Sequence, residues 1–523
     1  MTARQKHPAH RSGRARNLTP RGSLARRAAF AAAAASLGLA LAHGCASEQP
    51  AVGRPNILLI VSEDNGPELG SYGDFFARTP ILDTLARDGV RFQNAYVPQA
   101  GCSQSRAAFL TGLHPHQNGQ IGLATWRFGL YRDDTPNLVR SLKAAGYRTG
   151  IIGKLHINPA EAFPFDFAEI PNSNFQRKEM AAYSEAANTF IGQSDEPFFL
   201  SVNYPDAHRP FLRQVDGIPE DPQSPDDVEP LPYMGLDSPT LRRDSADYHN
   251  SMTRLDSLIG DLLATLQNSG KSRQTIVVYL GDHGADLLRG KRTCYEGGVR
   301  VPLIVRWPGR QEAGQGREEL VSTIDLVPTL LEAASAEPIP GLAGRSLAPL
   351  VAGESPGWRD LLFTEYHLHS NHNYFPQRAV RNSRYKLIWN LLPNERNPGY
   401  DFTVEKFIGE EEMAEALRQA SEEVRRAYEL MASPPEFELY DLEQDPFEFR
   451  NLAAEPGHEE SLRELRGKLL QWRQETADPF LDPLNVTRLK DEIEATRKNG
   501  QYERPDGWNY REYLAPAVPP WGG

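Results

Sequence analysis

The sequence predicts an α/β protein with a large, mostly parallel central sheet flanked by helices, together with a smaller C-terminal α+β domain. Three observations support this fold class. Mostly apolar runs are typical of parallel strands covered on both faces; they occupy 56–61, 197–204 and 274–280. Helical patterns alternate with these runs, as in βαβ units. Beyond about residue 357 the composition changes, and short strand patterns alternate with charged amphipathic helices.

The first 47 residues predict an export signal. They carry eight Lys or Arg and no Asp or Glu, and their apolar run from Ala28 to Ala42 is too short to span a bilayer. Arg26-Arg27 resembles a twin-arginine signal, and the stretch ending at Cys45 resembles a bacterial lipoprotein box. We expect an exported protein, periplasmic or lipid-anchored at the cell envelope. Two domains would follow, over 48–356 and 357–523.

Bulk composition indicates a soluble globular protein. The chain has 523 residues, of which 40% are hydrophobic and 24% charged, and its formal net charge is -12. Because an acidic surface repels a polyanion, nucleic acid is not an expected partner. An anionic substrate would need a local pocket of cations. The composition leaves the oligomeric state open.

Polar residues follow each of four apolar strands in chain order. The clusters are Glu63-Asp64 after 56–61, Lys154 and His156 after 149–153, Asp206 and His208 after 197–204, and Asp282-His283 after 274–280. Helices are expected between them at 80–86, 102–112, 136–146 and 245–269, with a long loop over 213–239. If strand 149–153 continued, Lys154 and His156 would share a face. Carboxyl ends of parallel strands meet at one edge, so a single site is predicted there.

Cys102 begins the helix 102–112, which ends at Gly112. A helix N-terminus favours an anion, because its first N–H groups are unpaired. The simpler alternative is a buried structural cysteine, and a disulfide with Cys294 is a further one. The carboxylates of Glu63, Asp64 and Asp282 offer the oxygen ligands that a hard divalent cation such as Ca²⁺ prefers. A capped turn is the alternative for Glu63-Asp64.

The C-terminal part predicts fewer elements. Strands are expected at 384–389 and 437–440, helices at 410–431 and 459–476, and an irregular tail after Pro479. The segment Tyr366 to Arg378 is expected to be a loop. As a loop of the second domain it is a candidate for sugar contacts, through His367, His369, His372 and Arg378, and an exposed polar loop without function is the alternative.

The motifs together resemble those of type I sulfatases, a family of the alkaline-phosphatase superfamily. The stretch Cys102-Ser-Gln-Ser-Arg106 with Leu110-Thr-Gly112 resembles the family signature. The companion motifs follow in order: Glu63-Asp64, Gly153-Lys-Leu-His156, His208, Asp282-His283, Gly290-Lys291 with Tyr295-Glu-Gly-Gly298, and Leu439-Tyr-Asp-Leu442. The resemblance covers about 54–480 and implies the fold and activity of a sulfatase.

This resemblance implies roles for individual residues. A maturation enzyme, which would be a partner of this chain, converts the cysteine to formylglycine, whose hydrate supplies a hydroxyl nucleophile. The metal ligands implied are Glu63, Asp64, Cys102, Asp282 and His283, around one divalent cation, expected to be Ca²⁺. Arg106, Lys154 and Lys291 would neutralise sulfate charge in the transition state. His208 would protonate the leaving atom, and His156 would help to release sulfate and restore the aldehyde.

A narrower resemblance is to the heparan N-sulfatases (N-sulfoglucosamine sulfohydrolases). It rests on His116-Gln-Asn-Gly119, Thr149 to Lys154 with His156, Pro164-Phe-Asp-Phe167, and Trp472 with Thr476-Ala-Asp-Pro479. Four positions depart from the usual patterns. Gln104 occupies the position where the maturation signal usually has proline. Glu63 replaces the more common aspartate, and His283 lies where asparagine is frequent. Lys291 follows the general sulfatase pattern rather than the N-sulfatase one.

Three other functions stay open at this point. The chain could be an O-sulfatase acting on another glycan, or a phosphate or phosphonate ester hydrolase. The third is an inactive glycan-binding lipoprotein in which Cys102 stays unmodified. The resemblance favours a sulfatase that acts on a sulfated carbohydrate, with the N-sulfo group of glucosamine as the specific hypothesis.

Overall fold

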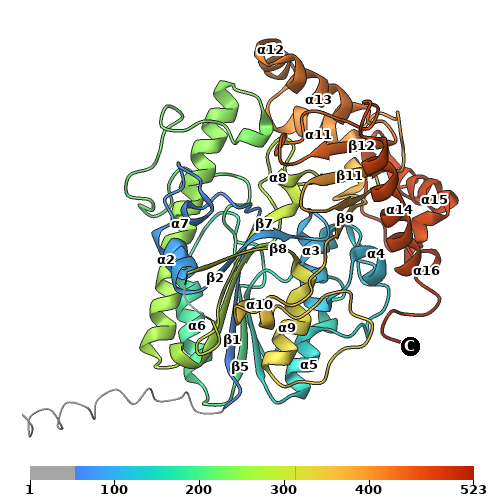
Figure 1. The fold of residues 1–523 in the computed structure, drawn as a ribbon. Coiled ribbons are helices and arrows are strands. Elements are labelled where there is room, and N and C mark those ends of the chain that lie inside the picture. The colour runs from blue at the N-terminus through green and yellow to red at the C-terminus, as the bar shows by residue number, and fades with distance from the viewer. Residues whose placement is uncertain (1–52, 312–313, 523) are drawn as a thin grey trace, which may run out of the picture. The chain divides into compact units, whose positions relative to one another are not determined.

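An eight-stranded sheet forms the centre of the fold (Figure 1). The computed structural model describes residues 53–311 and 314–522, so the predicted export signal and Cys45 lie outside the described residues. The strand order is β4-β3-β5-β1-β6-β7-β2-β8. In chain order the bounds are β1 Asn56–Ser62, β2 Val90–Tyr96, β3 Arg148–Gly153, β4 Phe167–Glu169, β5 Phe198–Tyr204, β6 Thr275–Gly281, β7 Arg300–Arg306 and β8 Gln315–Ser322. Only β7 runs antiparallel to its neighbours, so the predicted, mostly parallel sheet is confirmed.

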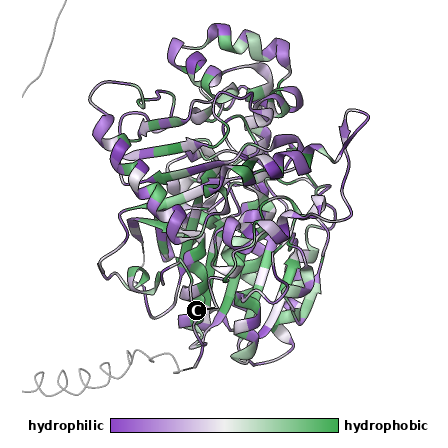
Figure 2. Cartoon of the chain, turned by 90° about the vertical axis from the view of Figure 1, so that its right-hand side faces the viewer, coloured by the Kyte–Doolittle hydropathy of each residue, from purple (hydrophilic) through white to green (hydrophobic). Residues whose placement is uncertain are grey.

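Helices cover both faces of this sheet, as predicted (Figure 1). Alternate residues of β1 point to opposite faces. Ile57, Leu59 and Val61 pack into the core that contains residues of α3 (Cys102–Thr111), α5 (Leu138–Ala144) and α9 (Leu326–Ala333). Leu58 and Ile60 pack into the core on the other face, with α2 (Pro80–Asp88), α6 (Ala182–Gly192) and α7 (Pro239–Asn268). Figure 2 shows the resulting concentration of hydrophobic residues along the central strands.

The carboxyl ends of the parallel strands are level with one another. Ser62 pairs with Tyr204 of β5 on one side and with Gly281 of β6 on the other. Gly153 at the end of β3 pairs with Asn203 of β5. The polar residues that follow β1, β3, β5 and β6 therefore emerge along one edge of the sheet, as their positions in the sequence predict.

A second sheet lies in the C-terminal part of the chain. It is an antiparallel meander in the order β12-β11-β10-β9, with bounds β9 Leu362–Tyr366, β10 Gln377–Arg381, β11 Tyr385–Asn390 and β12 Phe437–Asp441. One face packs against α14 (Glu459–Glu475) through a cluster that includes Val380, Leu387 and Trp472. The opposite face packs against Cys294 and Tyr295. The predicted smaller α+β part is therefore present.

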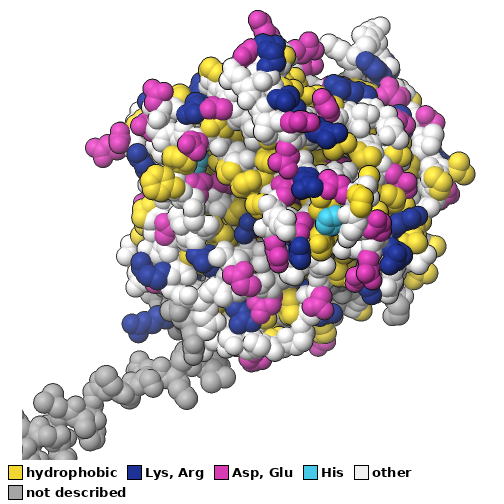
Figure 3. Space-filling model, turned by 45° about the horizontal axis from the view of Figure 1, so that its top comes forward, with side chains coloured by type: hydrophobic (Ala, Val, Ile, Leu, Met, Phe, Trp, Pro, Cys, Tyr) yellow, Lys and Arg dark blue, Asp and Glu magenta, His cyan; other side chains and the backbone are white. Residues whose placement is uncertain are grey.

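Within the described residues, both sheets belong to one compact unit. The division into two domains at residue 357 stays a prediction. On the face shown in Figure 3, Lys and Arg side chains are interspersed with Asp and Glu side chains rather than gathered by sign. Among the described residues no helix is both long enough and apolar enough to cross a bilayer.

Two helix predictions differ from the structure because of capping residues. The helix predicted over 245–269 begins earlier, at Pro239, since the side chain of Ser238 accepts a hydrogen bond from Leu241 N (3.2 Å). The helix predicted over 410–431 is two helices, α12 (Glu410–Gln419) and α13 (Glu422–Ala432). Ser421 separates them by capping α13 through a bond from Val424 N.

Three further segments are more ordered than predicted. The tail after Pro479 contains α15 (Pro483–Glu494) and α16 (Tyr510–Tyr513), whose apolar residues pack with Ile121 and Phe128. The segment Tyr366 to Arg378 begins in β9 and ends in β10, so only its middle is a loop. Strand β8 was not predicted, because the first half of this edge strand is polar and partly exposed.

Candidate active site

The helix α3 brings Cys102 to the carboxyl edge of the sheet. Gly101 occupies the N-cap position, and Gly112 ends the helix with φ 73°, in the left-handed region that glycine favours. All ten residues of α3 are buried, although half of them are polar. Cys102 is 1% exposed, and it is not bonded to the other described cysteine, Cys294. The disulfide alternative is therefore wrong.

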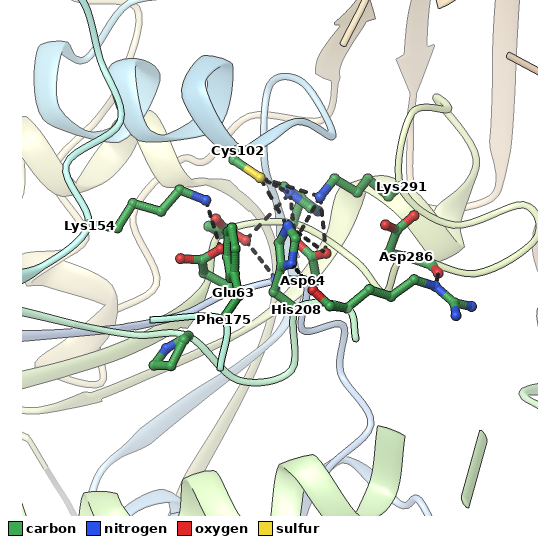
Figure 4. Close-up of polar contacts among 12 residues, drawn as sticks. Glu63, Asp64, Cys102, Lys154, Phe175, His208, Asp286 and Lys291 are labelled. Carbon is green, nitrogen blue, oxygen red and sulfur yellow. Dashed lines mark hydrogen bonds and ion pairs between the residues drawn. The ribbon is translucent and has the colours of Figure 1, made fainter. Parts of the chain in front are cut away.

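Three carboxylates surround the thiol (Figure 4). Asp64 follows β1 and Asp282 follows the adjacent β6, and Asp64 N donates to Asp282 Oδ1 (2.9 Å). The Sγ atom of Cys102 lies 3.9 Å from Asp64 Oδ1 and 3.4 Å from His283 Nε2. Glu63, Asp64, Cys102 and His208 form one group of adjacent ligand atoms, and Asp64, Cys102, Asp282 and His283 form another. The structure thus brings all five predicted metal ligands together.

Three buried cations complete the site. Lys291 Nζ donates to both oxygens of Asp64 at 3.0 Å and lies 3.4 Å from Cys102 Sγ. Lys154 Nζ donates to Glu63 Oε2 at 2.7 Å. The guanidinium of Arg106 donates to Asp282 Oδ2 (3.1 Å), to the carbonyl of Lys154 (2.9 Å) and to Asn203 Oδ1 (2.8 Å). The positive charge that an anion requires is therefore inside the protein rather than on its surface.

These charges set the protonation states within the cluster. Burial alone would raise the pKa of the Cys102 thiol, but Lys154, Lys291 and His283 lower it well below its usual range. Burial lowers the pKa of His283, but Asp282 and Asp64 outweigh it and raise the pKa to about 9. The pKa of Asp282 is lowered, because His283 and Arg106 outweigh its burial. Cys102 thus lies where an anionic atom is stabilised.

The donor set fits a divalent cation. Glu63 Oε1 is buried without a hydrogen-bond partner in the described part of the chain, and a metal ion would satisfy such an oxygen. His283 Nδ1 contacts the carbonyl of Gly284 (2.9 Å), and its Nε2 lies 3.2 Å from Asp64 Oδ1 and 3.4 Å from Cys102 Sγ. Three carboxylates oppose the three cations of Arg106, Lys154 and Lys291.

Two histidines adjoin the cluster from different elements. His208 follows β5, and its Nε2 lies 4.0 Å from Asp64 Oδ2. His156 lies beyond β3, which ends at Gly153, so the predicted shared strand face with Lys154 does not form. Both ring nitrogens of His156 lack hydrogen-bond partners among the described residues. Burial, and Lys154 next to it, hold the pKa of His156 well below its usual range, so its ring is neutral.

The four residues predicted to contact substrate lie in different environments. His369 is near Lys291, Arg292 and His283, which together with burial lower its pKa, and its Nδ1 has no partner in the described structure. His367 and Arg378 are fully buried and bonded to each other (3.1 Å). Arg378 also binds Asp478. His372 is exposed and contacts Trp126 and Tyr502. Only His369 lies beside the cluster around Cys102.

Sequence reasoning missed three residues beside the cluster. Asn203 is an amide within the apolar strand β5, and its polarity in a buried run was a usable signal. Phe175 stacks on the His208 ring with centroids 4.1 Å apart, and Arg177 contacts the carbonyl of His208. Both lie in the segment between β4 and α6, where nothing in the local sequence marks them.

Comparison with known proteins identifies the family. The sulfatase family profile matches residues 55–336, and a profile described as "N-sulphoglucosamine sulphohydrolase, C-terminal" matches 281–423. The chain belongs to the sulfatase family. It is therefore a hydrolase of sulfate esters or sulfamates, and the resemblance noted in its motifs is confirmed.

Individual relatives span most of the chain. Human N-sulphoglucosamine sulphohydrolase is 33% identical over 467 residues, which cover 82% of this chain and 91% of that protein. Human arylsulfatase A is 31% identical over 514 residues, covering 87% and 94%. A similar fold occurs in a structure solved with its substrate D-glucosamine-2-N,6-O-disulfate, with a TM-score of 0.60 and 21% identity over 82% of this sulfatase and 99% of that chain.

Proposed function

We propose that this sulfatase uses a formylglycine formed from Cys102 and removes the N-sulfo group of glucosamine in a sulfated glycan. The observation that carries the proposal is the position of Cys102. Its Sγ lies at the N-terminus of α3, 3.4 Å from Lys291 Nζ and 3.4 Å from His283 Nε2, beside three buried carboxylates. This combination of positive potential and ligand atoms suits the anionic sulfo group of a substrate held against a nucleophile.

Glu63, Asp64, Asp282 and His283 would hold the cation, with the modified side chain of residue 102 as a further ligand. We take the ion to be Ca²⁺, because carboxylate oxygens dominate the set. When bound, it would supply positive charge that polarises a sulfate oxygen. Two atoms support this assignment: Glu63 Oε1, which has no hydrogen bond within the described residues, and His283 Nε2, which faces Asp64 and Cys102.

The cations bind and orient the sulfate. Lys154 and Lys291 reach the cluster from opposite sides of Cys102 (Figure 4). Lys154 is 4% exposed and Lys291 is 3% exposed. In such a water-excluded site their charges act with little screening. Arg106 links a carboxylate of the cluster to the segment of Lys154, because its guanidinium donates to Asp282 and to the backbone carbonyl of Lys154. As negative charge moves onto the leaving atom, these fixed donors stabilise it without reorganisation.

Two histidines would move protons. The Nδ1 of His208 lies 2.5 Å from the carbonyl of Arg209, so Nδ1–H donates there and Nε2 faces the cluster. From that position Nε2–H can protonate the leaving nitrogen or oxygen. His156 is neutral with both ring nitrogens free, as a base near residue 102 must be to accept a proton when sulfate is released.

The choice of an amino-sugar substrate rests on similarity over both parts of the chain. The human N-sulphoglucosamine sulphohydrolase matches 82% of the sequence, and the C-terminal profile with the same description covers 281–423. This region includes His369, whose buried Nδ1 has no hydrogen-bond partner within the described residues and would accept or donate a bond to a sugar hydroxyl.

We also propose that the chain is exported to the periplasm or lipid-anchored through Cys45, and that its maturation enzyme acts before folding.

A panel of glucosamine derivatives, each sulfated at one position, tests the substrate. The protein is produced with a formylglycine-generating enzyme, and mass spectrometry of the Cys102 peptide first measures conversion. We expect sulfate release from glucosamine-2-N-sulfate to exceed that from the 3-O- and 6-O-sulfates. Faster release from an O-sulfate contradicts the N-sulfo assignment, and a Cys102 peptide found only as thiol contradicts the nucleophile. A phenyl phosphonate ester is assayed in parallel to test the alternative that the chain is a phosphate or phosphonate ester hydrolase.

A further inference from the structure

The carboxylate of Asp206 is buried and held by two arginines. Arg254, on α7, donates through Nε to Oδ2 (2.8 Å) and through Nη2 to Oδ1 (2.7 Å). Arg177, in the segment between β4 and α6, donates through Nε to Oδ1 (2.8 Å). All three side chains are at most 1% exposed. Asp206 is therefore not free to bind a metal or a substrate, and its position between β5 and His208 requires another explanation.

The remaining donors of Arg177 bind backbone carbonyls in two segments, the turn 205–208 and the segment that contains Phe175. Its Nη2 donates to the carbonyls of Pro205 (3.3 Å) and His208, and its Nη1 donates to the carbonyl of Phe175. Arg177 thus connects the turn 205–208 to the segment that carries Phe175. Its own φ of 51° is unusual for an arginine and is maintained by these contacts.

The turn 205–208 is also held by backbone hydrogen bonds to Glu63, which follows β1. Glu63 N donates to the carbonyl of Asp206 (3.0 Å), and Ala207 N donates to the carbonyl of Glu63 (2.6 Å). The turn that precedes His208 is consequently held between the end of β1 and the two arginines. Movement of either support would move the His208 backbone relative to Asp64 and Cys102.

These contacts leave His208 with one orientation. Its ring lies nearly parallel to that of Phe175, with an interplanar angle of 15°, while Nδ1 is occupied by the carbonyl of Arg209 (Figure 4). Lys154 Nζ lies 5.4 Å from the centre of the Phe175 ring. Phe175 therefore lies against both the candidate acid and one of the cations, and Nε2 is the atom of His208 left to face the cluster.

We propose that Arg177 is a positioning residue that holds His208, together with the Phe175 ring stacked on it, in the orientation that protonates the leaving group. This inference rests on the proposed role of His208 as the acid. As the nucleophilic oxygen of residue 102 bonds to sulfur, the bond from sulfur to the leaving atom breaks, and its electron pair stays on the leaving nitrogen or oxygen. His208 Nε2–H supplies the proton to that atom and takes up the electron pair of its own N–H bond.

The proposal separates proton transfer from sulfate binding. A weakly basic leaving group such as 4-nitrophenolate needs no proton, whereas unsubstituted phenolate gains from one. Loss of Arg177 should therefore have little effect on 4-nitrophenyl sulfate and a large one on phenyl sulfate. Loss of a sulfate-binding cation would instead reduce turnover of both substrates to the same extent.

The variants Arg177→Ala and Arg177→Lys are compared with the parent enzyme on 4-nitrophenyl, 4-chlorophenyl and phenyl sulfate. Asp206 keeps both bonds from Arg254 in each variant, so its charge stays paired. We expect kcat/KM for phenyl sulfate to fall roughly 10- to 100-fold more than that for 4-nitrophenyl sulfate, in line with the size of general-acid catalysis. Phe175→Leu should give the same trend at smaller size.

Two comparisons make the outcomes distinguishable. Arg473→Lys is the matched control, because Arg473 is also buried and binds a carboxylate (Asp478) and a backbone carbonyl (Phe480), but far along the chain from the site. His208→Ala is the benchmark. If it shows selective loss and both Arg177 variants do not, this inference is wrong and the proposed function stands. If His208→Ala itself shows no selective loss, the acid role in the proposed function is wrong.

Discussion

Gln104 connects the nucleophile helix to the C-terminal part of the chain. It is fully buried, and its Nε2 donates to the carbonyls of Leu368 (2.7 Å) and Ile121 (3.2 Å). Gln99 donates to the same two carbonyls. Leu368 precedes His369, so the two glutamines fix the loop that brings His369 to the site. A residue that departs from the usual maturation motif thus has a structural role in the folded protein.

We predict that Gln104→Pro uncouples maturation from this structural role. Residue 104 is in the first turn of α3, where a missing N–H costs little. The formylglycine content of the Cys102 peptide should equal or exceed that of the parent protein. The free energy of unfolding should fall by about 1–3 kcal/mol, because two buried carbonyls lose a donor. Gln99→Leu, outside the motif, is the control for lost hydrogen bonds, and reduced formylglycine content in Gln104→Pro would contradict the prediction.

The end of β3 depends on a glycine. Gly153 has φ 88°, and a Cβ atom there would lie 2.2 Å from the carbonyl oxygen of Asn203 on β5. This close approach sets where the chain leaves the sheet, and Lys154 is the next residue. The position of one cation of the site is therefore determined by backbone packing between two strands.

Gly153→Ala should lower activity far more than its effect on stability explains. The added methyl group pushes β3 away from β5 and displaces Lys154, and a shift of about 1 Å in a catalytic group can cost about 100-fold in rate. Gly146→Ala is the matched control, since it has φ 81° but no atom closer than 3.6 Å to a new Cβ. Kinetics on 4-nitrophenyl sulfate and thermal denaturation of both variants check this. Equal loss of activity in both would show that backbone strain alone is responsible.

At the scale of the whole molecule, a buried polar network joins the two sheets. Glu365 of β9 contacts His116 Nδ1 (2.5 Å) and lies 3.7 Å from Arg378 of β10. Arg378 binds His367 Nε2 and Asp478, and His367 Nδ1 lies 2.9 Å from Gln99 Oε1. Burial first, and then Arg378, lower the pKa of His367 to about 3, because protonated Nε2 would face the guanidinium.

The stability of the fold should decline in mild acid. The folded-state pKa of His367 is below its ordinary value of 6.5, so the unfolded chain binds the additional proton, and stability falls as pH falls from about 6.5 toward 3. Each such group costs about 1.4 kcal/mol per pH unit in this window. Burial also lowers the pKa of His114 to about 3, so His114 contributes to stability with the same pH dependence. Urea denaturation between pH 5 and 7 should give a shallower pH slope for His367→Asn than for the parent or for the control His458→Asn. An unchanged slope would be evidence against this assignment.

The sequence alone was sufficient where the signal is local. Apolar runs located β1, β5 and β6, and the polar residues after them located Glu63, Asp64 and Asp282, because parallel strands end together. Local patterns could not distinguish a buried arginine from an exposed one. Arg378 was expected to contact substrate, yet its partner Asp478 lies 100 positions later in the chain. Arg177 was missed for the same reason, since only tertiary contacts bring it to Asp206.

The burial of all ten residues of α3 has a consequence for how active protein is made. In the folded chain a second enzyme cannot reach Cys102, so under the proposed conversion two rates compete. Each newly made chain either meets the maturation enzyme first or closes around an unmodified thiol and remains inactive. The active fraction of a preparation would then be fixed at synthesis, whatever the concentration of maturation enzyme added later. Slower closure of the central sheet, for example at low temperature, would increase that fraction.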